Sequence, residues 1–303
     1  MKILLLGCKG QVGWELKRSL AVLGNLTSLD RHGQDNLSGD LADPEALAAT
    51  VKSINPDIVV NAAAYTAVDK AESEQQLTRT INAQAPARLA QEAKGVNAWL
   101  VQYSTDYVFD GSGSVPWKEE DPKEPLNVYG QTKLKGEEAI RQSGCNHLIF
   151  RTSWVYASRG QNFIRTMLRL AGEREGLRVI NDQFGVPTSA ELIADITAHT
   201  IHFIKRDNSH TGTYHLAPSG ETTWWDYARL VIDEASRAGL DLKVSDKDIV
   251  PVPTEEFPTP AARPRNSRLD TTRLQQAFGL HLPTWEEGVV RAVQEIIDPV
   301  WLT

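Results

Sequence analysis

Apolar residues along the first half of the chain follow two patterns. A continuous apolar run at residues 3–6 is typical of a strand buried on both faces of a parallel sheet, and further strands are predicted at residues 26–29, 57–60, 99–103 and 147–151. Between the first two predicted strands the apolar residues recur about every four positions, as on one face of a helix, at Val12, Leu16, Leu20 and Leu23. Strands that alternate with helices predict an α/β fold of the Rossmann type, with a doubly wound parallel sheet and right-handed crossovers.

The second half of the chain is less regular. Helical patterns occur near residues 160–172, 188–204, 223–238, 270–278 and 284–297. Between them we expect a long loop from Pro251 to Arg268, which carries five of the fifteen prolines; long loops in compact domains are often functional. The change of pattern predicts a first domain over residues 1–155 and a smaller lobe over residues 156–303, from which some segments return to the first domain.

Composition narrows the class of protein. The chain has 303 residues, of which 41% are hydrophobic and 23% charged, so it can bury a sizeable core and is not generally disordered. No apolar run is long enough for a membrane span or a secretory signal, which predicts a cytoplasmic protein. Two cysteines make no disulfide framework. A net charge of −7 without a basic block argues against a nucleic-acid polymer as partner.

A glycine-rich turn, Gly7-Cys8-Lys9-Gly10-Gln11-Val12-Gly13, connects the first predicted strand to the first predicted helix. Its glycines allow a tight turn and a close approach of a pyrophosphate to the free N–H groups of a helix N-terminus. The spacing is GxxGxxG, and its position between strand and helix distinguishes it from an ordinary turn. We therefore expect a dinucleotide site here, which makes residues 1–155 a dinucleotide-binding domain and residues 156–303 mainly a substrate-binding lobe.

Two charged residues at the end of the second strand point to different cofactors. Asp30 lies 17 residues after Gly13, where an acidic side chain accepts hydrogen bonds from the adenosine ribose and favours NAD(H). Arg31 follows directly, and a cation there can hold the 2′-phosphate of NADP(H), although a solvated surface charge is an equal alternative. The sequence predicts use of NADPH or NADH without a choice between them.

Tyr129 and Lys133 form a YxxxK pair on a helix predicted for residues 127–142. The spacing of four places both side chains on one helix face. A nearby ammonium is expected to lower the pKa of a phenol, which makes the tyrosine a good proton donor to a carbonyl that receives a hydride. Thr105 lies just beyond the fourth strand, at the carboxyl edge where such sheets bind ligands. We expect Thr105, Tyr129 and Lys133 to be catalytic.

These motifs together resemble the extended short-chain dehydrogenase/reductase family, and within it the reductases of dTDP-4-dehydrorhamnose. The similarity covers essentially the whole chain. It is carried by the glycine turn, by the YxxxK pair and by residues 61–72, 104–111, 151–156, 181–188 and 263–267.

The resemblance implies hydride transfer from NADPH or NADH to C4 of dTDP-4-dehydro-β-L-rhamnose, which gives dTDP-β-L-rhamnose. Tyr129 would donate the proton, Lys133 would assist it and bind the nicotinamide ribose, and Thr105 would hydrogen-bond the reacting oxygen. By the same carry-over the cofactor would be lined by Gln11, Val12, Asp30, Asp40, Leu41, Ala63, Ala64, Tyr65 and Thr66. These residues add to Gly7, Gly10, Gly13 and Arg31, which the glycine turn and the second strand already indicate.

The resemblance also implies substrate and metal contacts. Asp106 and Trp154 would touch the sugar, although Trp154 reads as core from its sequence alone. Arg263, with Arg265 and Arg268, is a candidate for the substrate pyrophosphate, with a solvated loop charge as the equal alternative. A homodimer with Mg²⁺ at its contact is expected from some relatives. The positions for that metal are Glu15, Glu191 and Asp195. Spacing alone favours a solvated or interfacial helix over a metal site that would include His199 and His202.

Three rival functions fit the same motifs. A nucleotide-sugar dehydratase would need a second carboxylate after Asp106, where this chain has Tyr107. A 4-epimerase, or another nucleotide-sugar reductase, would retain the site, and an epimerase would hold NAD tightly. A non-catalytic regulatory subunit is disfavoured by the intact set of Thr105, Tyr129 and Lys133.

Overall fold

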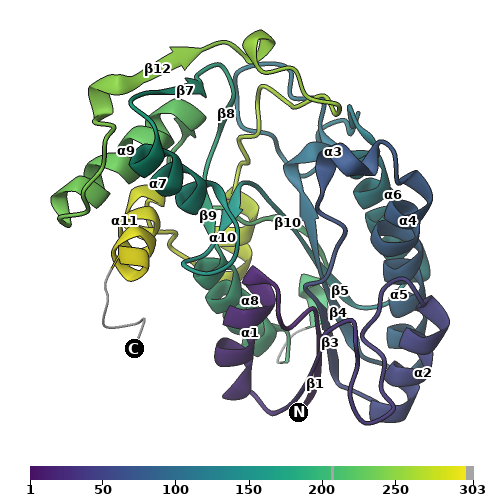
Figure 1. The fold of residues 1–303 in the computed structure, drawn as a ribbon. Helices are drawn as coiled ribbons and strands as arrows, with labels where there is room; N and C mark the ends of the chain where they lie inside the picture. Colours follow the sequence, from purple (N-terminus) through teal and green to yellow (C-terminus); the bar gives the residue numbers. More distant parts are fainter. Residues whose placement is uncertain (206–207, 298–303) are drawn as a thin grey trace.

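A six-stranded parallel sheet forms the centre of the molecule in the computed structural model, which describes residues 1–205 and 208–297 (Figure 1). The strand order is β10-β5-β4-β3-β1-β2, and every neighbouring pair is parallel. This confirms the doubly wound sheet. Its strands are β1 (Lys2–Leu6), β2 (Asn25–Leu29), β3 (Ile58–Asn61), β4 (Trp99–Thr105), β5 (His147–Thr152) and β10 (Gly212–His215).

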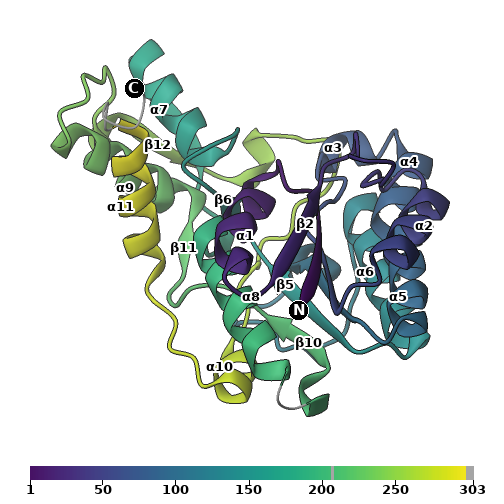
Figure 2. The ribbon, with the colours of Figure 1, turned by 90° about the horizontal axis from the view of Figure 1, so that it is seen from below.

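Helices cover both faces of this sheet, because alternate strand residues are apolar on each side. Leu4, Leu6 and Val59 face one layer, which is made by α2 (Pro44–Ile54), α5 (Ala85–Gly95) and α6 (Val128–Ser143). Ile3, Leu5 and Val60 face the other layer, which contains α1 (Gln11–Ala21), α8 (Ala190–Ile204) and α10 (Thr272–Phe278). Figure 2 shows the two layers on either side of the strands.

The second lobe has its own apolar core, centred on Tyr227 and Val231. Three helices enclose it, α7 (Phe163–Glu173), α9 (Trp224–Arg237) and α11 (Trp285–Ile297), at the upper left of Figure 1. Three two-stranded sheets complete the lobe. They pair β6 (Val155–Tyr156) with β9 (Thr188–Ser189), β7 (Leu177–Ile180) with β12 (Ile249–Val252), and β8 (Phe184–Gly185) with β11 (Thr222–Thr223).

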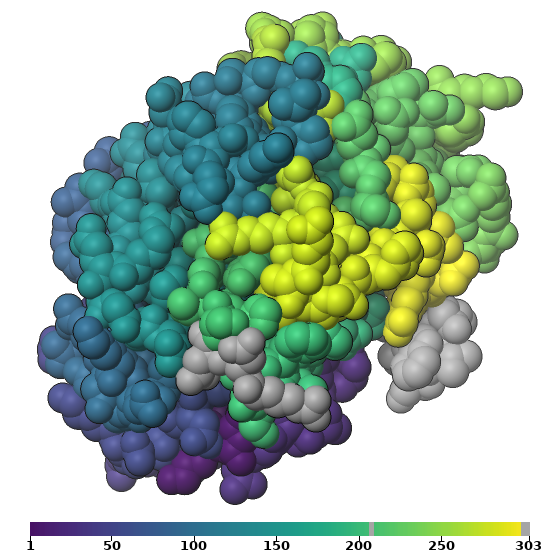
Figure 3. Space-filling model, turned by 180° about the vertical axis from the view of Figure 1, so that it is seen from behind, coloured from purple at the N-terminus to yellow at the C-terminus, as the bar shows by residue number. Residues whose placement is uncertain are grey.

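Segments from the second half of the chain complete the first core. Strand β10 pairs with β5 at the sheet edge, and α8 packs against α1. Helix α10 adds Phe278, whose ring centroid lies 5.1 Å from that of Tyr214 on β10. From behind, the yellow segment that contains α10 lies against the green residues of this region (Figure 3). The division of the chain at residue 155 stays a prediction.

Two connections differ from what the sequence indicated. The loop predicted from Pro251 is wrong at its start, because Pro251 and Val252 belong to β12 and pair with Val179 and Ile180. Proline is tolerated there since β12 is an edge strand of a two-stranded sheet. The short elements between β3 and β4 were not predicted; they are α3 (Val68–Ala71), α4 (Gln75–Arg79) and a π-helical turn (Thr80–Gln84).

The remaining connections contain four single 3₁₀ turns, at Asp106–Val108, Asn208–His210, Asp246–Asp248 and Thr254–Glu256. Over the described ranges, the model contains no helix with the length and apolar character that a bilayer crossing requires.

Candidate active site

The turn between β1 and α1 can form only with glycine at two positions. Gly7 has a φ of +80°, and a Cβ on it would lie 2.7 Å from the backbone N of Ala63. A Cβ on Gly13 would overlap the carbonyl oxygen of Gly7. Gly10 caps α1 without a side-chain hydrogen bond, so the first N–H groups of the helix are left to an anion. The turn therefore fits a dinucleotide pyrophosphate.

A cavity of about 1370 Å³ begins at this turn and follows the carboxyl ends of the sheet strands. Gly13 does not line it, because it packs against Gly7 inside the turn. All the other predicted cofactor residues line the cavity, namely Gly7, Gly10, Gln11, Val12, Asp30, Arg31, Asp40, Leu41, Ala63, Ala64, Tyr65, Thr66, Tyr129 and Lys133.

Several lining residues were missed in the sequence. Tyr103 and Thr152 come from the ends of β4 and β5, and Ile193 comes from α8. Tyr103 is the last residue of one predicted strand and Thr152 directly follows another, so their position at the carboxyl edge is the signal that could have identified them. No local signal marks Ile193, because only the packing of α8 on α1 brings it to the cavity.

Charged side chains gather where the cavity passes the end of β2. Asp30 forms an ion pair with Lys9 of the glycine turn and accepts a hydrogen bond from the backbone N–H of His32 at 2.9 Å. These two partners lower the pKa of Asp30. Arg31 and Asp40 line the same region. This end of the cavity thus contains both the carboxylate that would bind the ribose of NADH and a cation that would hold the 2′-phosphate of NADPH.

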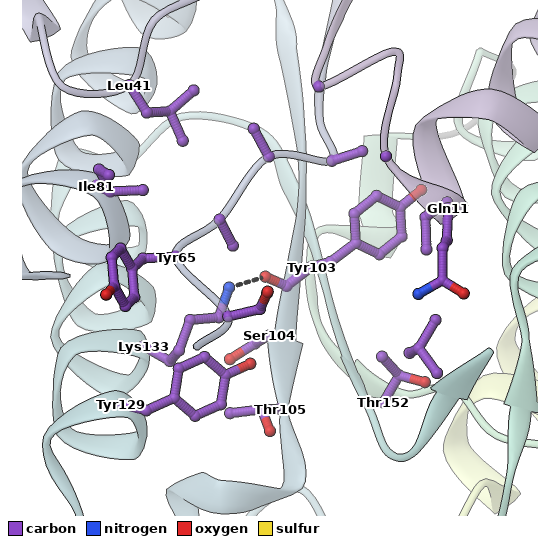
Figure 4. A pocket seen from close by; sticks show the side chains of 18 of the residues that line it. Gln11, Leu41, Tyr65, Ile81, Tyr103, Ser104, Thr105, Tyr129, Lys133 and Thr152 are labelled. Carbon is purple, nitrogen blue, oxygen red and sulfur yellow. Dashed lines mark hydrogen bonds between the residues drawn. The ribbon is translucent and has the colours of Figure 1, made fainter. Parts of the chain in front are cut away.

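Helix α6 carries the YxxxK pair into the opposite part of the cavity (Figure 4). Asn127 caps the helix by accepting from the N–H of Gly130 at 2.8 Å. Lys133 is buried, and its Nζ donates to the carbonyl oxygen of Tyr103 at 2.6 Å. Burial lowers the pKa of Lys133 to about 8, against the opposing charge of Glu137. The bond to Tyr103 fixes the ammonium at the end of β4.

The phenol of Tyr129 differs from the sequence expectation. Burial raises its pKa above the ordinary value, the neighbouring Asp106 adds to the rise, and the hydroxyl of Thr105 opposes it. Lys133 is not among the groups that shift this pKa, since its ammonium is directed at Tyr103. The expected lowering by Lys133 is therefore not found. Tyr129 keeps its proton at neutral pH, as a proton donor must.

Thr105 and Asp106 lie where β4 ends. The Thr105 hydroxyl donates to Asp106 Oδ1 at 3.0 Å and accepts from the N–H of Tyr107 at 3.1 Å. Asp106 is only 2% exposed, and its Oδ2 has no hydrogen-bond partner in the described part of the chain. Burial raises the pKa of Asp106 to about 6. An unpartnered buried oxygen beside the cavity is suited to a polar ligand group.

A buried ion pair, unexpected from the sequence, lies next to Lys133. Glu137, one helical turn after it, accepts from Arg151 Nη2 at 2.6 Å and Nε at 2.9 Å, and from Ser104 Oγ at 2.6 Å. These charge-assisted bonds lower the pKa of Glu137 despite its complete burial. The pair ties α6 to β4 and β5 and so holds the helix that carries Tyr129.

Two tryptophans that pack against the core of the second lobe, Trp154 and Trp224, line the cavity. Their rings stack with centroids 3.8 Å apart. Trp154 has a φ of +47°, a left-handed conformation that is rare for a bulky residue and is associated with functional sites. Its partial burial fits a wall of the cavity better than the core position that its sequence suggested.

The loop arginines do not line the cavity. Arg263 pairs with Asp69 at 2.8 Å, Arg268 pairs with Glu221 at 3.1 Å, and Arg265 pairs with Glu255. Each charge is thus matched by a carboxylate in this structure. A role for Arg263 toward a substrate pyrophosphate stays a prediction.

The three carboxylates proposed for a metal lie on the neighbouring helices α1 and α8. Arg18 lies 3.7 Å from Glu15 and 3.0 Å from Asp195, while Glu191 pairs with Arg291 at 3.1 Å. Within residues 1–205 and 208–297 no three His, Cys, Asp or Glu side chains are grouped to hold a metal ion. The packing of α1 on α8 brings together positions that the sequence could not relate, but their charges are matched by arginines. The Mg²⁺ site stays a prediction.

Comparisons with known proteins agree with this geometry. Residues 1–297 match the family described as RmlD substrate binding domain. The chain is 56% identical over 296 residues to the dTDP-4-dehydrorhamnose reductase of Escherichia coli K12, covering 98% of each chain.

Two solved structures have the same fold. They are dTDP-4-dehydrorhamnose reductases from Clostridium acetobutylicum, with a TM-score of 0.86, and from Bacillus anthracis, in complex with NADP, with a TM-score of 0.85. Each is 33% identical, and each comparison covers 97% of this chain and 99% of the other. The chain therefore belongs to the RmlD substrate binding domain family.

Proposed function

We propose that this protein reduces the C4 keto group of dTDP-4-dehydro-β-L-rhamnose to dTDP-β-L-rhamnose with NADPH or NADH. The observation that carries the proposal is the meeting of Thr105, Tyr129 and Lys133 in one cavity with the glycine turn. The identity of 56% to the reductase from Escherichia coli supports the choice of substrate.

The residues divide the reaction between them. The bound nicotinamide cofactor would supply a hydride to C4. Tyr129 then gives its proton to the C4 oxygen, so that hydride and proton together convert the carbonyl to a hydroxyl. Thr105 hydrogen-bonds that oxygen, and the buried Lys133 would bind the nicotinamide ribose. Asp106 and Trp154 would contact the sugar from the β4 end and the second lobe.

The rival functions fit less well. A dehydratase would need a second carboxylate next to Asp106, and Tyr107 occupies that position with its ring in edge contact with Tyr129, at a centroid distance of 5.7 Å. A 4-epimerase would show no net oxidation of cofactor. A homodimer with Mg²⁺ at the surface of α1 and α8 is proposed from the family resemblance alone.

The proposal is tested by following NADPH and NADH oxidation at 340 nm with dTDP-4-dehydrorhamnose. We expect turnover by the natural protein and a loss of at least about 100-fold for Tyr129→Phe, since that variant lacks the proton donor.

Tyr227→Phe is the matched control. Its hydroxyl is buried in the second lobe, outside the cavity, and has no hydrogen-bond partner among the described residues, so its removal should leave activity unchanged. No oxidation by the natural protein would refute the function, and an unimpaired Tyr129→Phe would refute the mechanism.

A further inference from the structure

The ion pair between Lys9 and Asp30 stands at the end of the cavity that would receive the adenosine ribose. Lys9 is 77% exposed and Asp30 is 14% exposed, so the lysine can leave its partner while the carboxylate stays in place. Arg31 and Asp40 are the other charged groups that line this end, together with the imidazole of His32. Arg31 Nε lies 3.4 Å from that imidazole.

A carboxylate in this position has opposite effects on the two cofactors. It accepts hydrogen bonds from the ribose hydroxyls of NADH, and it repels the 2′-phosphate of NADPH. The strength of that repulsion depends on whether a cation neutralises the carboxylate. Lys9 does so in this structure through a direct ion pair, and it belongs to the turn that would receive the pyrophosphate.

We propose that Lys9 determines cofactor selectivity by exchanging its ammonium between Asp30 and the 2′-phosphate. With NADH the ammonium stays on Asp30, which binds the ribose hydroxyls. With NADPH the ammonium moves to the phosphate and, with Arg31, outweighs the charge of Asp30. The pocket thereby accepts both cofactors. This inference rests on the proposed dinucleotide site. It gives a role to Lys9, a position at which the GxxGxxG motif specifies no residue type.

The test measures binding of NADP⁺ and NAD⁺ by titration calorimetry to the full chain without sugar substrate. We expect Lys9→Gln to weaken NADP⁺ about tenfold, the usual effect of losing one charge-assisted phosphate contact, and to change the Kd of NAD⁺ less than about twofold. Lys17→Gln is the control. Lys17 lies over the ring of Trp14 on α1, outside the cavity, and its loss should change neither Kd.

Asp30→Asn provides the second arm. We expect it to weaken NAD⁺ and to tighten NADP⁺. In the Asp30→Asn background the effect of Lys9→Gln on NADP⁺ should grow beyond about tenfold, because the ammonium no longer has to leave a carboxylate in order to reach the phosphate.

The outcomes are distinguishable. A natural protein that binds neither cofactor would refute the proposed function. If both cofactors bind, an unchanged ratio in Lys9→Gln overturns the inference alone. An effect of Lys9→Gln that does not grow in the Asp30→Asn background also overturns it, since Lys9 would then act independently of Asp30.

Discussion

Asp106 is a buried carboxyl group whose ionisation opposes folding. Its pKa in the folded protein is raised to about 6 by burial, whereas an exposed aspartate has a pKa near 3.8. The folded state therefore binds the proton more tightly than the unfolded state. The stabilisation from this proton is complete below about pH 4 and is lost as the pH rises through 6.

The prediction is a pH-dependent difference in the free energy of unfolding between the natural protein and Asp106→Asn. Relative to the variant, the natural protein should lose about 2–3 kcal/mol between pH 4 and pH 7, and the difference should then be constant. Urea unfolding at a series of pH values measures it. A difference that does not vary with pH would show that the carboxyl group is not held in a desolvated state.

At the scale of elements, the position of α1 depends on the close packing of Gly13 against the carbonyl group of Gly7. The helix begins directly over the turn, and a side chain at residue 13 would displace it from the carbonyl of Gly7. Because the first N–H groups of α1 are the expected anion site, such a displacement should affect cofactor binding more than folding.

We predict that Gly13→Ala weakens NADP⁺ binding at least about tenfold, as expected for displaced helix N–H donors. Gly172→Ala is the matched control, since Gly172 is also helical, in α7, and a Cβ there meets nothing within 4 Å. That variant should be stabilised by about 0.5–1 kcal/mol without a change in binding. Equal NADP⁺ affinities of the two variants would refute the packing argument.

Elements with a strong local pattern could be predicted from the sequence. The first five sheet strands and the helices that bear the glycine turn and Tyr129 occur within one or two residues of their predicted bounds. Strand β10 could not be predicted, because Gly212–His215 is short and becomes a strand only by pairing with β5, more than 60 residues earlier in the chain. The spacing of Tyr129 and Lys133 indicated a shared helix face, but not the bond from Lys133 to Tyr103, which depends on how α6 packs on β4.

At the scale of the molecule, the cavity lies where the two cores meet. Most of its wall comes from residues around the central sheet, and Trp154 and Trp224, which pack against the core of the second lobe, complete it. A ligand that fills it contacts both parts of the chain and binds only when both are folded.

Cofactor binding should therefore stabilise the whole protein. With free NADP⁺ at 100 times its Kd, the free energy of unfolding is expected to rise by about 2.7 kcal/mol, from linkage alone. Thermal unfolding with and without NADP⁺ measures the effect, and inorganic phosphate at the same concentration is the control. If NADP⁺ does not raise the midpoint of thermal unfolding, the idea that the folded protein forms the cofactor site is contradicted.

The return of α8 and β10 to the sheet has a consequence for synthesis on the ribosome. The first 155 residues emerge before the helix that packs over Ile3, Val60 and Phe150, and before the strand that pairs with β5. During translation this face of the sheet is an open apolar surface with an unpaired edge, which is the kind of surface that chaperones bind and that aggregates when left exposed. Completion of the nascent sheet must wait until about residue 215 has been added and has left the exit tunnel.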